Sequence, residues 1–472
     1  MFPSQARALK PTKWAAIAWI ANSGRSLLRQ AEVDRAVLFG LLTRFWQMLT
    51  GPVTLLFIAR YFKPEIQGFY YTFASLLALQ AFVELGFYLV IINVSSHEWA
   101  RLQLNIKGRI VGEPTALSRL VSLGRLTFKW YAVASAIFVV GVGGFGFLFF
   151  SQKHYSNIAW QAPWVVLVLL TGFVLWGLPF NSLLEGCGQV GTVNRFRLSQ
   201  AILETVVLWT TLAAGGGLWA AAASAGVRFL RDLYLLLVQY RRFFEPFFAP
   251  PAGPRMDWQT EVWPMQWRLG LAGLVNYFAF SLFTPVMFQY HGAVVAGQMG
   301  MTLVIVGAVQ AVAAIWVYTK VPKFGMLIAK RDFIQLDRFW LRTSLMSLVV
   351  SCGGALAGWV SVYVLNIWHA RLAERLLKPL PLGLFLIAAI LMQVSQCQTA
   401  YLRAHRQEPL VVLSVVSSLA IGLSVWLLGR QFGPTGAAVG YLGVAAAVIL
   451  PWETAIWFNC RALWHGHKEY SL

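Results

Sequence analysis

The sequence predicts an all-α polytopic membrane protein of about twelve transmembrane helices, arranged as two six-helix bundles around a central cavity. Three observations predict this class. The 472-residue chain is 58% hydrophobic and only 12% charged, whereas about 25% of an average soluble domain is charged. Apolar runs recur at the length of a bilayer crossing, and short motifs recur in the same order in both halves. This composition excludes a disordered chain and a single water-soluble core.

The predicted spans are apolar runs of about 20 residues, the length that a helix needs to cross a hydrocarbon core of about 30 Å. Their residues do not alternate between polar and apolar, so a transmembrane barrel is not expected. The predicted spans cover residues 38–59, 69–93, 126–150, 162–184, 198–215, 217–240, 267–290, 293–319, 340–365, 381–400, 409–428 and 436–458.

The distribution of Lys and Arg predicts the orientation. With both termini cytoplasmic, the cytoplasmic segments hold 27 of the 38 basic residues and the external connections hold 7. Cytoplasmic loops of membrane proteins carry such an excess. The net charge of +20 is therefore explained by topology, and no nucleic-acid partner is expected.

The spans divide the chain into five segments. An amphipathic N-terminal segment is expected on the cytoplasmic membrane surface, because its short apolar stretch is flanked by basic residues. Two bundles, a linker and a tail follow. The predicted boundaries are 1–37 for the N-terminal segment, 38–240 for the first bundle, 241–266 for a cytoplasmic linker, 267–458 for the second bundle and 459–472 for a cytoplasmic tail.

Three motif pairs indicate an internal repeat, at offsets of 229, 218 and 216 residues. In the first pair Gly68 matches Gly297. Six helices in each half would make a parallel repeat, and transporters of this kind bind their substrate between the halves. Chance recurrence of small-residue loops is the alternative. The pairs are FKPEIQGFYYTF (62–73) with HGAVVAGQMGMTL (291–303), LLEGCGQ (183–189) with YLRAHRQ (401–407), and GLWAAAAS (217–224) with GPTGAAVG (433–440).

Basic residues lie deep in two spans of the first half: Arg44, with Gln47 three residues on, and Arg228 with Arg231. A charge at this depth is costly and should face protein or water. Arginines in a water-filled cavity could bind an anionic head group with bidentate hydrogen bonds. The alternative for Arg228 is an ion pair with Asp232, four residues later on the same helix.

Deep carboxylates and amides form a second set of candidates. Glu84, Glu204, Asp232 and Glu453 are candidates for proton or cation coupling, or for ion pairs and hydrogen bonds with neighbouring helices. Gln393 and Gln396, at positions i and i+3 of span 381–400, could bind sugar hydroxyls or hold helices together.

No motif of an enzyme or cofactor site is present with its required context. We therefore expect no catalytic residues, no cofactor and no metal. The cysteines are far apart and show no ligand spacing, so neither disulfide nor metal binding is expected for Cys187, Cys352, Cys397 and Cys460.

The stretch RYFKPEIQGFYYTFASLLALQAFVELGF (60–87), with NVSSHEWARL (93–102) and LEGCGQVGTVNRFR (184–197), resembles bacterial polysaccharide-biosynthesis membrane proteins. These are the O-antigen (Wzx-type) flippases of the multidrug/oligosaccharidyl-lipid/polysaccharide (MOP) exporter superfamily. The resemblance covers about residues 38–460. It implies two six-helix bundles in the bacterial inner membrane and flipping of a polyprenyl-pyrophosphate-linked glycan for surface polysaccharide or lipopolysaccharide synthesis. It also implies glycan polymerase and glycosyltransferase machinery as partners.

The resemblance further implies basic cavity residues in the first half, for which Arg44 and Arg228 occupy suitable positions. The second half departs from a symmetrical phosphate site, because span 267–290 has no deep basic residue and its polar groups are Asn276 and Gln289. Alternating access by a lipid-linked oligosaccharide flippase is thus the first hypothesis. A cation-coupled exporter of drugs or small molecules, working through Glu84 or Glu204, is the alternative.

A membrane enzyme acting on lipid-linked glycan, such as a ligase or polymerase, is a third hypothesis. Such enzymes usually carry a large outer loop. The largest predicted outer loop here, 366–380, is only about 15 residues long, which disfavours this hypothesis.

Overall fold

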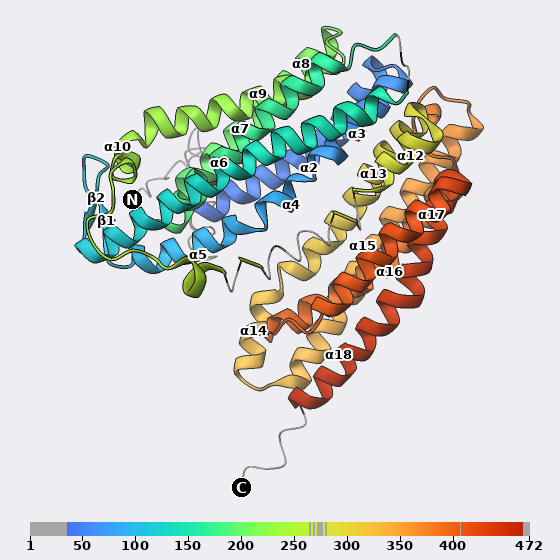
Figure 1. Cartoon of the computed structure of the whole chain (residues 1–472). Helices are drawn as coiled ribbons and strands as arrows, with labels where there is room; N and C mark the ends of the chain where they lie inside the picture. Colours follow the sequence, from blue (N-terminus) through green and yellow to red (C-terminus); the bar gives the residue numbers. More distant parts are fainter. Residues whose placement is uncertain are drawn as a thin grey trace, which may run out of the picture.

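The computed structural model describes residues 35–153, 155, 157–263, 266, 267, 270, 277, 278, 281–405 and 407–465. The predicted N-terminal segment therefore lies almost wholly outside the described residues. Two helical lobes meet at one end and diverge toward the other (Figure 1). We call these the joined end and the splayed end.

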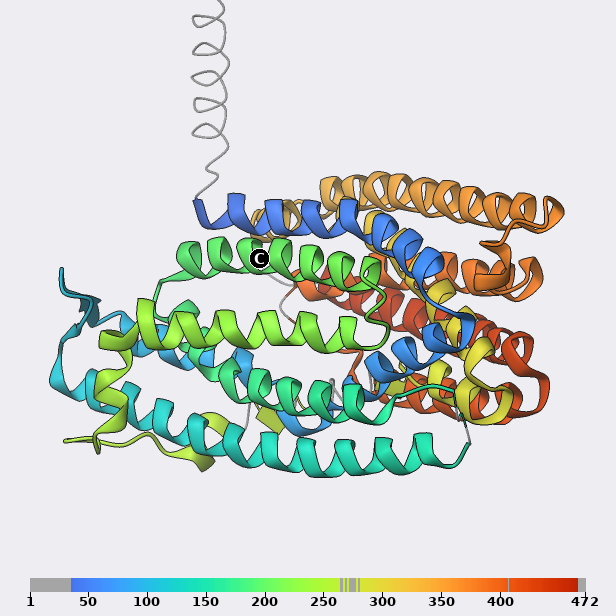
Figure 2. The same cartoon turned by 90° about the horizontal axis from the view of Figure 1, so that it is seen from above.

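The first lobe follows the chain through the predicted spans one to six. Its long helices run roughly side by side, as the view from above shows (Figure 2). Its helices are α2 (Arg35–Tyr61), α3 (Pro64–Leu77), α4 (Gln80–Glu84), α5 (Phe87–Trp99), α6 (Pro114–Ser151), α7 (Gln161–Gly186), α8 (Val190–Ala213) and α9 (Trp219–Tyr234), which a π-helical turn (Leu235–Gln239) extends.

The second lobe has the same plan. The predicted span 267–290 lies partly outside the described residues, and its described helix is α12. The helices are α12 (Phe283–His291), α13 (Ala293–Tyr318), α14 (Val321–Ala329), α15 (Phe333–Ile367), α16 (Pro379–Ala404), α17 (Val411–Val444) and α18 (Leu450–His465), with a π-helical turn (Ala445–Ile449) between the last two.

Within the described residues, eight helical segments are long and apolar enough to cross a membrane. One of them, Val411–His465, contains the last two predicted spans. The backbone leaves the helical conformation at Gly433 (φ 62°, ψ −146°), which separates these spans at the position the sequence predicts. α18 continues to His465, into the segment predicted as the cytoplasmic tail.

The predicted span 69–93 is divided into α3, α4 and α5. Leu85 and Gly86 adopt left-handed conformations, with φ of 52° and 63°, and no helix continues through such a pair. The hydropathy of the sequence does not predict this break, because the residues on both sides of it are apolar.

The loop predicted for 94–125 is largely ordered structure. It contains an antiparallel hairpin of β1 (Leu102–Leu104) and β2 (Ile110–Gly112), and α6 begins at Pro114 rather than near 126. Proline suits the first turn of a helix because its missing N–H would be unpaired there. The predicted linker is ordered as well, with α10 (Arg241–Phe244), a 3-10 turn (Glu245–Phe248) and a π-helical turn (Trp258–Val262).

The two-lobe repeat is confirmed by the helix boundaries. α3 begins at Pro64 and α13 at Ala293, which preserves the offset of 229 residues. α7 ends at Gly186 and α16 at Ala404, which preserves the offset of 218 residues. The recurring motifs therefore mark equivalent helix ends in the two lobes.

Candidate functional site

The two lobes meet where α3 crosses α13. A Cβ atom added to Gly68 would lie 1.8 Å from the carbonyl oxygen of Ala293, and one added to Gly297 would lie 2.9 Å from the backbone nitrogen of Gly68. Only glycine lets two backbones approach this closely. The glycine pair that defines the sequence repeat thus forms the contact between its halves.

Polar side chains add to this crossing. The Gln67 amide, in a residue only 1% exposed, donates hydrogen bonds to the carbonyl oxygens of Gly297 (2.9 Å) and Arg375 (3.1 Å). Arg375 Nη2 donates to the Phe62 carbonyl at 2.5 Å. We call Gln67, Gly68, Gly297 and Arg375 the interlobe latch. In this set, side chains of one lobe donate hydrogen bonds to backbone carbonyls of the other lobe, which holds the joined end closed.

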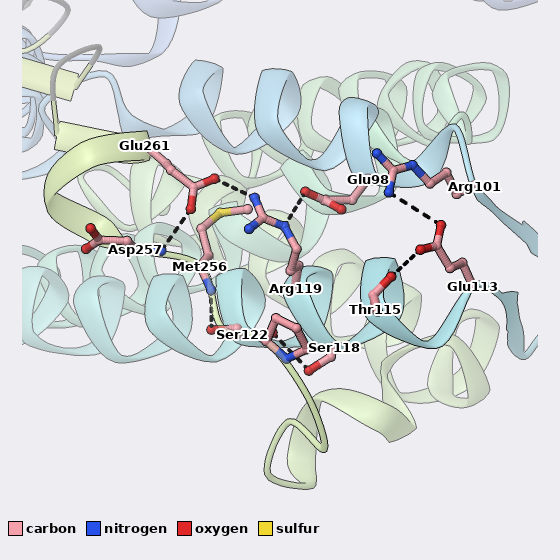
Figure 3. A network of polar contacts seen from close by, with 11 residues as sticks. Glu98, Arg101, Glu113, Thr115, Ser118, Arg119, Ser122, Met256, Asp257 and Glu261 are labelled. Carbon is pink, nitrogen blue, oxygen red and sulfur yellow. Dashed lines mark hydrogen bonds and ion pairs between the residues drawn. The ribbon is translucent and has the colours of Figure 1, made fainter.

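The linker between the lobes is bound to the first lobe by polar contacts (Figure 3), toward the splayed end of the molecule (Figure 1). Arg119 of α6 donates from Nε to Glu98 of α5 at 2.8 Å and from Nη2 to Glu261 of the linker. The hydrogen bond from Arg119 lowers the pKa of the Glu261 carboxyl. Ser118 of α6 hydrogen-bonds the linker backbone at Gly253 (2.9 Å). The linker is therefore part of the first lobe and not a free connection.

Arg228 on α9 is paired with Glu204 on α8. Its Nε and Nη2 atoms donate to the two carboxylate oxygens, each at 3.0 Å. Gln200 donates to the same carboxylate at 2.9 Å. Asp232 instead accepts a hydrogen bond from Asn181 of α7 at 3.2 Å. The ion pair of Arg228 thus joins two helices, and Asp232 is not the partner that local spacing suggested.

Arg231, three residues further along α9, also contacts α8. It donates to the Ser199 hydroxyl, and its guanidinium lies 4.1 Å from the centre of the Phe196 ring. Its Nε atom has no hydrogen-bond partner among the described residues. This donor is buried, so it is unsatisfied in this conformation and not exposed to a ligand.

Arg44 and Gln47 are exposed on α2, which packs against α8 through Trp46. The Trp46 indole donates to Thr205 at 3.3 Å. Arg44 lies two residues before Trp46, or about 200° around the helix, so it is on the face away from α8. The structure does not bring Arg44 into the Arg228–Glu204 pair.

A small pocket lies between α7 and α9. Asp232 and Asn181 are its polar groups, and its volume is about 20 Å³, roughly the space of one water molecule. Four aromatic side chains of the two helices help to line it, namely Phe173, Trp176, Phe180 and Phe229.

A larger cavity, of about 220 Å³, lies between α13 and α16 of the second lobe. Its polar groups are the amides of Gln310, Gln393 and Gln396, and no charged side chain lines it. Gln393 donates to Ser347 at 2.7 Å, and the Gln396 oxygen accepts a hydrogen bond from the Tyr318 hydroxyl at 2.6 Å. Gln310 is not among the residues predicted from the sequence, although it is an amide within the apolar span 293–319.

The remaining candidate residues are not among those that line this cavity. Glu84 ends α4 beside the left-handed break. Glu453 of α18 is buried and accepts hydrogen bonds from Ser395 and Thr399 of α16. Gln289 donates to the Gln152 side chain at 2.6 Å near the joined end. Asn276 lies outside the described residues.

Neither a protein-family model nor a curated protein matches the sequence, but solved structures match the fold. The lipid II flippase MurJ in an inward closed conformation has a TM-score of 0.61 at 11% identity, over 90% of this chain and 90% of that one. An inward-facing multidrug-resistance MATE-family transporter has 0.57 at 12% identity, over 86% and 98%. A MOP-superfamily transporter from Pyrococcus furiosus has 0.53 at 13% identity, over 90% and 95%.

The chain therefore has the fold of the MOP-superfamily transporters and is a multi-pass membrane protein. Identities this low establish a common architecture and not a common substrate, because one fold serves many functions. The substrate of such a transporter depends on the side chains of its binding site.

Proposed function

We propose that this protein is a flippase that moves a lipid-linked oligosaccharide across the bacterial inner membrane by alternating access. The amide-lined cavity of the second lobe carries the proposal. Primary amides both donate and accept hydrogen bonds, as sugar hydroxyls do. Gln310 and Gln396 offer such groups without any charge in the cavity lining, so a neutral glycan fits this cavity better than an organic cation does.

The arginines of α9 would bind the anionic link between glycan and lipid. Arg228 is half exposed, with 52% of its side-chain surface accessible, although it is paired with Glu204. The Nε donor of Arg231 has no partner among the described residues, but it is buried and would have to become exposed to bind a phosphate. Arginine suits a pyrophosphate because its planar fork forms two parallel hydrogen bonds with phosphate oxygens. Arg44 lies on another face and would contribute only in a different conformation.

The orientation follows from the excess of basic residues on one side. The connection between spans 69–93 and 126–150 and the connection between spans 293–319 and 340–365 are predicted to be cytoplasmic, and both lie at the splayed end (Figure 1). We infer that this end faces the cytoplasm, where the glycan would enter. The interlobe latch would then close the external side and would have to open for release.

A reconstitution experiment tests the cavity. The full chain in proteoliposomes should move a fluorescent polyprenyl-pyrophosphate oligosaccharide between leaflets. Gln310→Leu and Gln396→Leu should each lower the rate about tenfold, since a lost hydrogen bond to the substrate is worth ~1.5 kcal/mol. Gln398→Leu is the matched control, because Gln398 of the same helix binds Thr454 of α18 at 3.0 Å. Unchanged rates in both cavity variants would contradict the proposal.

A cation-coupled exporter of small molecules is the second candidate, supported by the first-lobe pocket. Aromatic walls around Asp232 are suited to an organic cation. The pocket of about 20 Å³ would have to widen greatly, because drug-sized ligands occupy about 300 Å³ or more. Efflux of a fluorescent organic cation that Asp232→Asn abolishes would favour this candidate. Transport of the glycan lipid that Asp232→Asn leaves intact would favour the first.

A further inference from the structure

Glu453 is the most deeply buried acid in the described part of the chain, with the residue 2% exposed. It lies in the first turn of α18, directly after the π-helical turn. The Thr399 hydroxyl donates to its Oε1 atom at 2.6 Å, and the Ser395 hydroxyl donates to Oε2. These two hydroxyls occupy positions i and i+4 of α16, so one helix face binds both oxygens of the carboxyl.

No Lys, Arg or His of the described residues forms an ion pair with Glu453. Arg403 on α16 and Tyr318 on α13 interact with it electrostatically. Among the described residues, no titratable group of α15 or α17 forms an ion pair or a hydrogen bond with Glu453, and the π-helical turn Ala445–Ile449 contains no titratable residue. Arg403 is itself paired with Glu408 at 3.1 Å. The charge of an ionised Glu453 would thus have no direct counter-ion.

An ionised carboxylate in this position would be costly. A buried charge without a partner costs several kcal/mol, and more in the membrane interior than near water. A neutral carboxyl fits better, because each hydroxyl can donate to one oxygen or accept the acid proton. Sodium fits less well: the two hydroxyls are at hydrogen-bond distance from the carboxyl oxygens, and two oxygen-bearing neighbours fall short of the usual ligand number of a hard cation.

Thr399 connects this carboxyl to the second-lobe cavity. Met392, Gln396 and Thr399 follow one another on one stripe of α16, at positions i, i+4 and i+7. Met392 and Gln396 line the cavity, and Thr399 is only partly buried. Thr399 thus lies one helical turn beyond the cavity-lining Gln396 on the same stripe, and its hydroxyl contacts the buried carboxyl.

We propose that Glu453 is a proton-binding site of the second lobe, which takes up one proton from cavity water and returns it there past Thr399. Protonation forms one O–H bond on the carboxyl, and deprotonation leaves the carboxylate hydrogen-bonded to Ser395 and Thr399. Proton binding stands independently of the substrate. Its coupling to transport rests on the proposed function.

Infrared spectroscopy of the full chain in lipid tests proton binding without any substrate. The carbonyl stretch of a protonated carboxyl should be present at neutral pH and should be lost in Glu453→Gln. Thr399→Val should shift this band, because it removes one hydrogen bond to the carboxyl. Thr454→Val is the matched control, since this α18 hydroxyl pairs with Gln398 instead, and it should leave the band unchanged.

Two outcomes would overturn the inference. A band that survives in Glu453→Gln would assign the proton to another residue. A band that appears in potassium buffer and disappears in sodium buffer would make the site a sodium site. Both measurements are possible on protein that transports nothing, so they can fail or succeed separately from the proposed function.

Transport measured at different pH values tests the coupling. The wild-type rate should depend on pH, and Glu453→Gln should lose at least most of that dependence. Gln396→Leu should lower the rate but keep the dependence. An unchanged pH profile in Glu453→Gln would show that protonation of Glu453 is not coupled to transport. If the wild type moved no glycan lipid at all, the proposed function would be refuted instead.

Discussion

The two lobes share one order of helices but satisfy their deep polar groups differently. In the first lobe a charge is paired with a charge: Arg228 binds Glu204 through two hydrogen bonds of 3.0 Å. Inside the predicted spans of the second lobe, amides pair with hydroxyls and Glu453 has hydroxyl partners only. The interhelix ion pair of Arg461 with Asp337 lies outside those spans. Backbone layout depends on apolar length and on glycines such as Gly68 and Gly297, which occupy equivalent positions in the two halves. The polar residues inside that shared layout differ between the lobes.

The largest expected effect comes from the element that both lobes share. Gly68→Ala would place a Cβ 1.8 Å from the Ala293 carbonyl oxygen, so the lobes must separate at the joined end. We expect loss of most transport and destabilisation of at least ~1–3 kcal/mol, as for an overpacked core. Thermal unfolding in detergent and spin-label distances across the joined end measure both effects.

Gly307→Ala is the control for this substitution. It lies in α13, and nothing lies within 4 Å of a Cβ at that position. It should stabilise the helix slightly, because alanine is the better helix former. Equal behaviour of the two variants would show that the lobes do not meet at Gly68.

The second prediction concerns the charge pair of the first lobe. Arg228→Ala leaves Glu204, whose side chain is only 18% exposed, without its cation. We expect a loss of about 1–3 kcal/mol in the free energy of unfolding, toward the low end because Arg228 is itself half exposed. Removing both partners should recover part of that loss, and a double-mutant cycle measures the coupling.

Asp232→Asn tests the competing partner within the same cycle. If Arg228 were paired with Asp232 along its own helix, this substitution would remove the coupling. We expect it to leave the coupling of Arg228 and Glu204 unchanged. Loss of this coupling in Asp232→Asn would show that Arg228 is paired with Asp232, within α9.

A smaller effect is expected from the side chains of the interlobe latch. Gln67→Leu removes the hydrogen bonds to the carbonyls of Gly297 and Arg375. A net loss of ~1.4 kcal/mol would shift the balance of closed and open joined ends about tenfold. Gln298→Leu is the control, because its hydrogen bond to the Glu374 carbonyl is solvent-exposed. Distance distributions across the joined end should change in the first variant and stay constant in the second.

The sequence predicted the fold class, the repeat and most helix positions, because apolar length and basic loops carry that information. It predicted that Gly68 and Gly297 are equivalent but not that they touch, since contact depends on how the two lobes are arranged. It offered Asp232 as the alternative ion-pair partner of Arg228, because spacing along one helix is visible in sequence. The actual partner, Glu204, is 24 residues away and becomes adjacent only when α8 packs on α9.

The binding of the linker to the first lobe was also missed. Its signal was present in the sequence, because Phe243, Phe244 and Phe247 give the predicted connection an apolar character that a solvated loop does not need. All three side chains are buried. Apolar residues in a basic segment between two bundles are thus evidence of a packed linker.

The smallest expected effect is the pH dependence of this linker. The hydrogen bond from Arg119 lowers the pKa of Glu261 below its ordinary value. Such a group stabilises the folded contact at pH values above its ordinary pKa of about 4.3, and the contribution is lost as the pH falls through the lowered value. The effect should be below ~1 kcal/mol, because the two side chains are 29% and 35% exposed.

Hydrogen exchange of the amides at 253–262 measures this contribution after correction for intrinsic exchange. Protection should be constant from about pH 5 to 8 and should fall below about pH 4. Glu261→Gln should lower protection at neutral pH and abolish its fall in acid. Glu113→Gln is the control, because the pKa of this acid is lowered by Thr115 and Arg101 at the start of α6, away from the linker. A fall that persists in Glu261→Gln would assign the acid sensitivity to another carboxyl and leave Arg119 bound mainly through Glu98.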